Sequence, residues 1–62
     1  MEAFIKQLEI EIRQQENLLH DYVTRQDWFQ AGGQVEYIKG LKDALHLARS
    51  QMIYEKAKKG SR

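Results

Sequence analysis

The sequence contains no cysteine and no proline. Without cysteine the chain has no disulfide cross-link and no thiolate zinc site, and a reducing compartment would suit it. His20 and His46 are the only imidazole ligands, too few for a structural zinc site. Without proline, no residue removes a backbone donor from a helix. We therefore expect no cofactor, no metal and long uninterrupted helices.

Long hydrophobic runs are also missing. No apolar stretch approaches the roughly 20 residues that a membrane-spanning helix needs. The first residues, Met1-Glu2-Ala3-Phe4, carry an acid where a signal peptide carries bases. We expect a cytoplasmic protein with no membrane partner.

The chain is short, with 62 residues, 42% of them hydrophobic and 31% charged. This hydrophobic content is too high for a disordered chain. A monomer of this size buries only about 60% of its unfolded surface, so its stability is marginal. With disulfides and zinc excluded, self-association is the remaining source of stability.

The net charge of +1 conceals an asymmetry. Residues 1–31 carry three bases and six acids, a net charge of −3, whereas residues 32–62 carry seven bases and three acids, a net charge of +4. Opposite charges favour an arrangement in which one half folds back along the other.

Two segments show helical periodicity. The first is expected to form a helix from about residue 2 to 23, and the second from about residue 27 to 58, with residues 59–62 as a frayed tail. In the first, apolar side chains repeat at a and d spacings, interrupted only by Gln15: Ile5, Leu8, Ile12, Leu19 and Tyr22, widened by Phe4, Leu18 and Val23. In the second the stripe consists of Ile38, Leu41, Leu45, Ala48 and Met52, widened by Tyr37, Ala44, Leu47 and Tyr54.

The connection between the helices allows two interpretations. Asp27 followed by Gln30 resembles a capping box, which favours a second helix that begins at Asp27 and contains Gly32-Gly33. Alternatively Gly32-Gly33 is a loop and the helix begins near Gln34. The first interpretation gives the glycines a packing role, because Gly33, Gly40 and Ala44 share one helix face and would let another backbone approach.

These features predict one all-α domain over residues 1–62, an antiparallel two-helix hairpin. Two helices cannot enclose a core, so we expect a homo-oligomer, as a four-helix bundle or a larger assembly, with the dimer as its simplest form. The candidate packing residues lie on the second helix: Gly33, Ile38, Gly40, Leu41, Ala44, Leu45, Ala48 and Met52.

Trp28 and Phe29 lie next to each other at the bend. Adjacent helical side chains point about 100° apart, so both cannot face one core. We expect one to plug the end of the hairpin and the other to be a candidate contact for a partner protein.

The sequence offers little for catalysis. Asp43, His46 and Ser50 share a helix face, but local spacing on one helix is not the geometry of a catalytic triad. Glu16 and His20 are four residues apart, and a solvated polar face explains them better than a metal site. No phosphate-binding loop is present. We predict that the protein is not an enzyme.

Basic residues accumulate on the second helix and could contact nucleic-acid phosphates in a dimer. The low net charge and the acidic first helix argue against a dedicated nucleic-acid-binding protein. This function is kept as the alternative, with Lys39, Lys42, Arg49, Lys56, Lys58 and Lys59 as its candidate contacts.

The pair Asp27-Trp28 and the run Val-Glu-Tyr-Ile-Lys-Gly-Leu-Lys-Asp-Ala-Leu over residues 35–45 resemble a group of short uncharacterised open reading frames of tailed bacteriophages. Glu36 stands where that pattern prefers glycine, and Gly32-Gly33 is additional. The resemblance implies a phage origin, a helical hairpin and a location in the host cytoplasm or the virion. It implies no known activity and no binding residues.

Together these observations predict a non-enzymatic protein–protein interaction module. The resemblance suggests that its partner is a larger viral or host protein, with this chain acting as a virion-associated component or as an inhibitor of a host enzyme.

Overall fold

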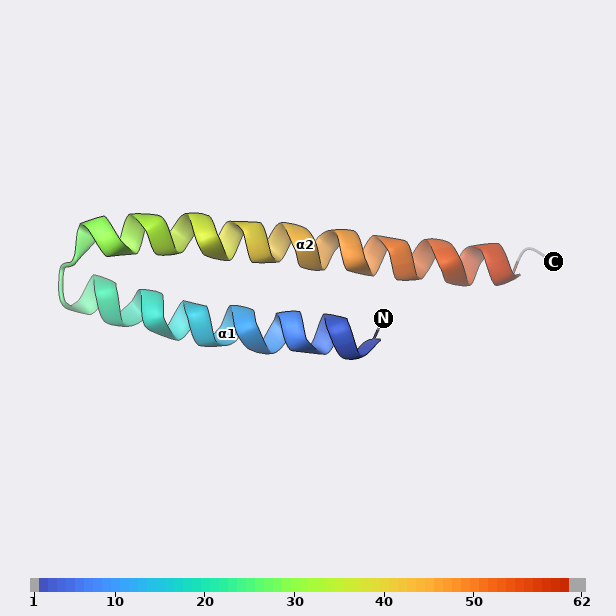
Figure 1. The fold of residues 1–62 in the computed structure, drawn as a ribbon, viewed down its shortest axis with the longest axis horizontal. Helices are drawn as coiled ribbons and strands as arrows, with labels where there is room; N and C mark the ends of the chain where they lie inside the picture. The colour runs from blue at the N-terminus through green and yellow to red at the C-terminus, as the bar shows by residue number, and fades with distance from the viewer. Residues whose placement is uncertain (1, 61–62) are drawn as a thin grey trace.

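The structure, a computed structural model, describes residues 2–60, and the side chains of residues 2–57. It consists of two helices, α1 (Glu2–Thr24) and α2 (Trp28–Gly60), which run antiparallel (Figure 1). The prediction of an all-α helical hairpin is confirmed. The part of the chain that the structure describes contains no strand.

The helix boundaries differ slightly from those expected. Helix α1 ends at Thr24 rather than near residue 23, and α2 begins one residue after Asp27. Helix α2 also continues to Gly60, so residues 59 and 60 belong to the helix and the tail predicted over 59–62 is wrong there. The helix extends because no proline or earlier helix-ending residue interrupts it. Residues 61 and 62 lie outside the described residues.

At the bend, the C-terminal cap of α1 is followed directly by the N-terminal cap of α2. Gln26 has φ of 60°, its N–H donates to the Val23 carbonyl, and the Asp27 N–H donates to the Tyr22 carbonyl. This hydrogen-bond pattern is a Schellman motif with glutamine at the left-handed position. The Asp27 carboxylate then accepts the Gln30 N–H at 3.2 Å, and so caps α2. Asp27 therefore takes part in both helix ends.

Gly32-Gly33 lies inside α2 and not in a loop. Of the two interpretations of the connection, the continuous helix is therefore the correct one. Because the helix is continuous, it also brings Ala31 into the contact with α1, where its side chain is buried. Ala31 is not among the packing residues predicted from the sequence.

The contact between the helices follows the two predicted stripes. Its buried side chains are Ile5, Ile12, Ala31, Ile38 and Ala48. None of the described side chains is fully buried. The pair of helices is therefore a seam and not an enclosed core. Half-buried side chains continue the seam: Leu8, Leu19, Tyr22, Leu41, Leu45 and Met52.

Two ion pairs link the acidic helix to the basic one. The Lys42 ammonium lies 3.2 Å from the Glu16 carboxylate, and the Arg49 guanidinium lies 2.7 Å from the Glu9 carboxylate. These contacts fit the opposite charges of the two halves. About half of each side chain is exposed, so each pair contributes at most about 1 kcal/mol to stability.

Candidate interaction surface

A second stripe of side chains runs beside the seam on both helices. In α1 it follows positions 4, 8, 11, 15, 18 and 22, and in α2 positions 30, 34, 37, 41, 44 and 48. These spacings of three and four residues place each set along one helix face. Three large side chains on it are exposed, with 55% for Phe4, 36% for Leu18 and 50% for Tyr37, whereas Leu8, Tyr22 and Leu41 are half-buried. We call Phe4, Leu18, Tyr22, Tyr37, Leu41 and Ala44 the apolar face.

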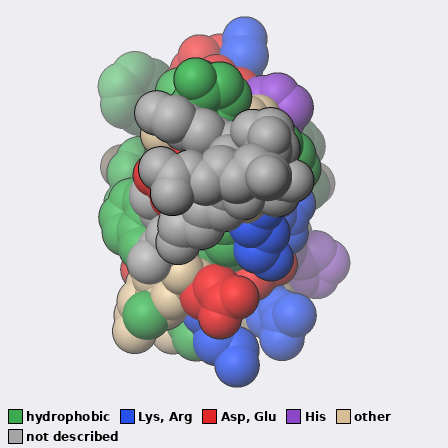
Figure 2. Space-filling view, turned by 90° about the vertical axis from the view of Figure 1, so that its right-hand side faces the viewer, with side chains coloured by type: hydrophobic (Ala, Val, Ile, Leu, Met, Phe, Trp, Pro, Cys, Tyr) green, Lys and Arg blue, Asp and Glu red, His purple; other side chains and the backbone are tan. Residues whose placement is uncertain are grey.

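Charge is nearly absent from this stripe. Glu11 is its only charged residue, and Glu11 is half-buried. Figure 2, a view along the helices, shows hydrophobic side chains gathered on one side of the molecule, and basic and histidine side chains on the other. The interhelix ion pairs Glu16–Lys42 and Glu9–Arg49 belong to the charged side.

Three polar side chains form a network within the apolar stripe. The Gln15 amide donates to the Glu11 carboxylate at 2.8 Å. The Gln34 amide in turn donates to the Gln15 carbonyl at 3.0 Å and to the Gln15 side-chain oxygen at 2.6 Å. Each of the three side chains therefore takes part in at least one hydrogen bond, as is usual for half-buried polar groups.

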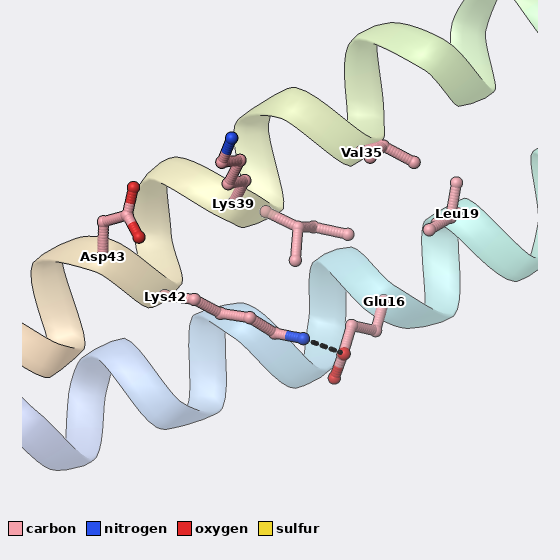
Figure 3. A pocket seen from close by; sticks show the side chains of 7 residues that line it. Glu16, Leu19, Val35, Lys39, Lys42 and Asp43 are labelled. Atoms are coloured by element: carbon pink, nitrogen blue, oxygen red, sulfur yellow. Dashed lines mark ion pairs between the residues drawn. The ribbon is translucent and has the colours of Figure 1, made fainter.

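A groove of about 460 Å³ lies between the helices on the charged side (Figure 3). Leu19, Val35 and Ile38 form its apolar part, and the Lys42–Glu16 ion pair spans from α2 to α1 across one end. Lys39 and Asp43 complete the lining. The lining thus combines three apolar side chains with two acids and two bases.

Trp28 and Phe29 are both exposed, at 64% and 90%. The expectation that one of them plugs the end of the hairpin is therefore wrong. Both belong to the first turn of α2, and the buried side chain of that turn, which faces α1, is Ala31. Trp28 precedes Val35 by seven residues, two helical turns, and so lies on the side of the groove.

The predicted packing residues do not all lie on one surface. Ile38, Leu45 and Met52 contribute to the seam with α1, and Ala44 lies on the apolar face. Gly33 and Gly40 are exposed, and a Cβ built on either meets no atom within 4 Å. Within one hairpin, therefore, no other helix lies close to these glycines. Leu41 and Ala48 stand where the seam and the second stripe meet.

The candidate nucleic-acid contacts whose side chains the structure describes are exposed along α2 but are partly neutralised. Lys42 and Arg49 are paired with carboxylates of α1. Lys39 and Lys56 are exposed and make no ion pair among the described residues. The side chains of Lys58 and Lys59 lie outside the described residues. The described part of the chain thus presents mixed charge along α2.

The residues considered for catalysis or metal binding do not converge. Asp43, His46 and Ser50 are all exposed on α2, and Glu16 and His20 are exposed on α1. Across the described residues, no group of three histidine or carboxylate side chains could hold a metal ion.

The apolar face was the surface that sequence reasoning missed as a site. From the sequence, Phe4, Leu18 and Tyr37 widen the predicted stripes and Ala44 is a candidate packing residue, but no separate surface joins them. The signal that identifies them is a second heptad pattern, displaced by one residue from the first, since positions 4, 11 and 18 precede Ile5, Ile12 and Leu19. A helix that packs against two neighbours shows such paired patterns.

Comparisons with known proteins provide no relative. No family model, no curated protein and no solved structure matches the chain. Within the described residues, neither helix has a stretch apolar and long enough to cross a bilayer.

Proposed function

We propose that this chain is a small, non-enzymatic protein–protein interaction module that works as a homo-oligomeric helical bundle. The observation that supports this function best is the exposure of large apolar side chains along one side of the hairpin, such as Phe4 and Tyr37. Grouped exposed apolar residues are typical of interaction sites.

The bend supplies a second contact surface in this proposal. Trp28 is the only tryptophan of the chain, and Phe29 beside it is 90% exposed. Tryptophan is enriched among the residues that dominate binding energy at protein interfaces. We propose that Trp28 and Phe29 contact a larger protein, for which the phage resemblance suggests a virion component or a host enzyme.

A capture experiment tests this function. The full chain is immobilised and incubated with a bacterial host lysate, beside a Trp28→Ala/Phe29→Ala variant and a Leu47→Ala control, in which an exposed leucine of α2 is replaced. We expect one protein to be retained by the parent chain and the control but lost from the double variant. Retention by all three chains, or by none, contradicts the proposed contact.

The alternative function, binding of nucleic acid through α2, predicts different behaviour. Such binding would weaken steeply with added salt, because the contacts displace counterions. Pairing of Lys42 and Arg49 with α1 carboxylates argues against it. Nucleic acid retained at low salt and released between about 50 and 200 mM salt would favour this alternative.

A further inference from the structure

We infer that the apolar face binds the same face of a second copy of this chain, so that two hairpins form a four-helix bundle. This inference rests on the proposed homo-oligomeric function and deepens it by assigning the contact surface. It replaces the glycine strip, Gly33 and Gly40, with Phe4, Leu18 and Tyr37 as the centre of the contact.

The first argument is the pair of heptad patterns on each helix. Positions 5, 12 and 19 of α1 face α2, whereas positions 4, 11 and 18 form a second line beside them. In α2, Ile38 and Leu45 face α1, and Tyr37 and Ala44 form the second line. Each helix of a four-helix bundle contacts two neighbours, which requires two adjacent lines of this kind. The hairpin supplies one neighbour for each helix, and a second hairpin supplies the other.

The second argument is electrostatic. A surface that pairs with its own copy brings each residue near the two-fold axis close to the same residue of the partner, so an uncompensated charge there would be repelled. The apolar stripe carries no lysine or arginine at the positions that define it, and Glu11, its one acid, already accepts a hydrogen bond from Gln15. On the other side, the carboxylates of Glu9 and Glu16 are already paired with Arg49 and Lys42 within the hairpin. A second copy therefore fits the apolar face.

The third argument is size. Helix α1, with 23 residues, extends for about 35 Å, and the molecule is 16 Å wide across its two helices. A stable interface buries about 800 Å² per partner. This is about 15% of the accessible surface of 5200 Å². The backbone of a broad side spans about 560 Å², and the side chains that project from it add to this area, so the side is of the order that a stable dimer uses.

The arrangement also leaves the bend accessible. Trp28 lies on the side of the groove lined by Val35, away from the apolar face. Both copies would therefore present Trp28 after dimerisation. Self-association and binding of a larger protein use different surfaces and can occur together.

Analytical ultracentrifugation of matched variants tests the inference. Tyr37→Lys and Leu18→Lys alter the apolar face, whereas Ile53→Lys and Ile10→Lys place the same change at exposed positions outside it, one on each helix. We expect the parent chain to form dimers. The dissociation constant should rise more than about tenfold for the first two variants and change little for the controls, because a lysine is buried only in the first two. Circular dichroism checks that each variant remains helical.

Three results would overturn parts of this inference separately. A parent chain that dimerises equally well with Tyr37→Lys and Leu18→Lys contradicts the assigned face but leaves the homo-oligomeric function standing. Weakening confined to the Ile10 or Ile53 variants would assign the contact to another face of the hairpin. A parent chain that remains a folded monomer up to millimolar concentration contradicts both the inference and the oligomeric function. If a lysine variant loses its helical signal, Tyr37→Ala and Leu18→Ala are measured in its place. They should also raise the dissociation constant of the dimer more than the controls do.

Discussion

The side-chain amide of Gln34 donates hydrogen bonds both to the main-chain carbonyl of Gln15 and to its side-chain oxygen, at 3.0 and 2.6 Å. This contact joins α2 to α1 at the one position where the apolar periodicity of α1 is broken. Both side chains are half-buried. Polar contacts of this kind restrict the register of helices at some cost in stability.

Replacing one partner of this contact should be worse than replacing both. We expect Gln34→Leu to lower the free energy of unfolding by about 1 kcal/mol, because Gln15 loses its donor. In Gln15→Leu/Gln34→Leu two apolar side chains meet, and the loss should be recovered or exceeded. Urea denaturation followed by circular dichroism measures both effects. A single variant as stable as the parent chain would show that the contact contributes nothing net.

Glycine at position 26 should stabilise the bend. Gln26 has φ of 60°, a region that glycine adopts without the steric cost of a side chain. We expect Gln26→Gly to raise the free energy of unfolding by about 0.5–1 kcal/mol, and the melting temperature by a few degrees. The control is Gln14→Gly in the exposed interior of α1, which should lower stability by about 1 kcal/mol. A destabilised Gln26→Gly protein would contradict the left-handed conformation.

Alanine should be tolerated at the glycines of α2. A Cβ at Gly33 or Gly40 meets nothing within 4 Å, and both residues are helical. We expect Gly33→Ala and Gly40→Ala each to raise stability by about 0.5–1 kcal/mol in thermal denaturation at fixed protein concentration. Sedimentation of the same variants should show unchanged self-association. Weaker association would instead support a close helix approach at the glycine strip.

The seam should depend on Ile38, which is 5% exposed. We expect Ile38→Ala to cost about 2–5 kcal/mol, because it leaves a cavity between the helices, and Ile38→Asp to abolish the helical signal. Ile53→Ala is the matched control, since Ile53 is 65% exposed and should cost much less. Circular dichroism over a temperature range compares them. A fully helical Ile38→Asp protein would show that the seam is wrongly assigned.

Removal of the single charge from the apolar stripe should strengthen self-association. Glu11→Gln keeps an oxygen that accepts the Gln15 amide but removes a carboxylate that a second copy would desolvate. We expect the dissociation constant of the dimer to fall by roughly three- to tenfold in sedimentation. Glu36→Gln, at an exposed position of α2, should leave it unchanged. Equal effects of the two substitutions would indicate a response to net charge alone.

Much of the fold could be predicted because it depends on local pattern. The absence of proline, the apolar repeats through Ile5, Ile12 and Ile38, and the capping sequence at Asp27 each act within a few residues. The sequence also shows that the first half is acidic and the second half basic. In the structure, Glu9 and Glu16 of α1 accordingly pair with bases of α2.

Other features depend on how two helices are rotated against each other, which a single periodic stripe does not specify. The sequence by itself determined two long helices, their antiparallel pairing and most residues of the seam. Only the tertiary structure decided that Ala31 is buried while Trp28 and Phe29 are exposed, and that Gly33 and Gly40 face open space. The physical reason is that α1 covers only one face of α2, so the rotation of α2 selects which of several apolar or small residues are covered.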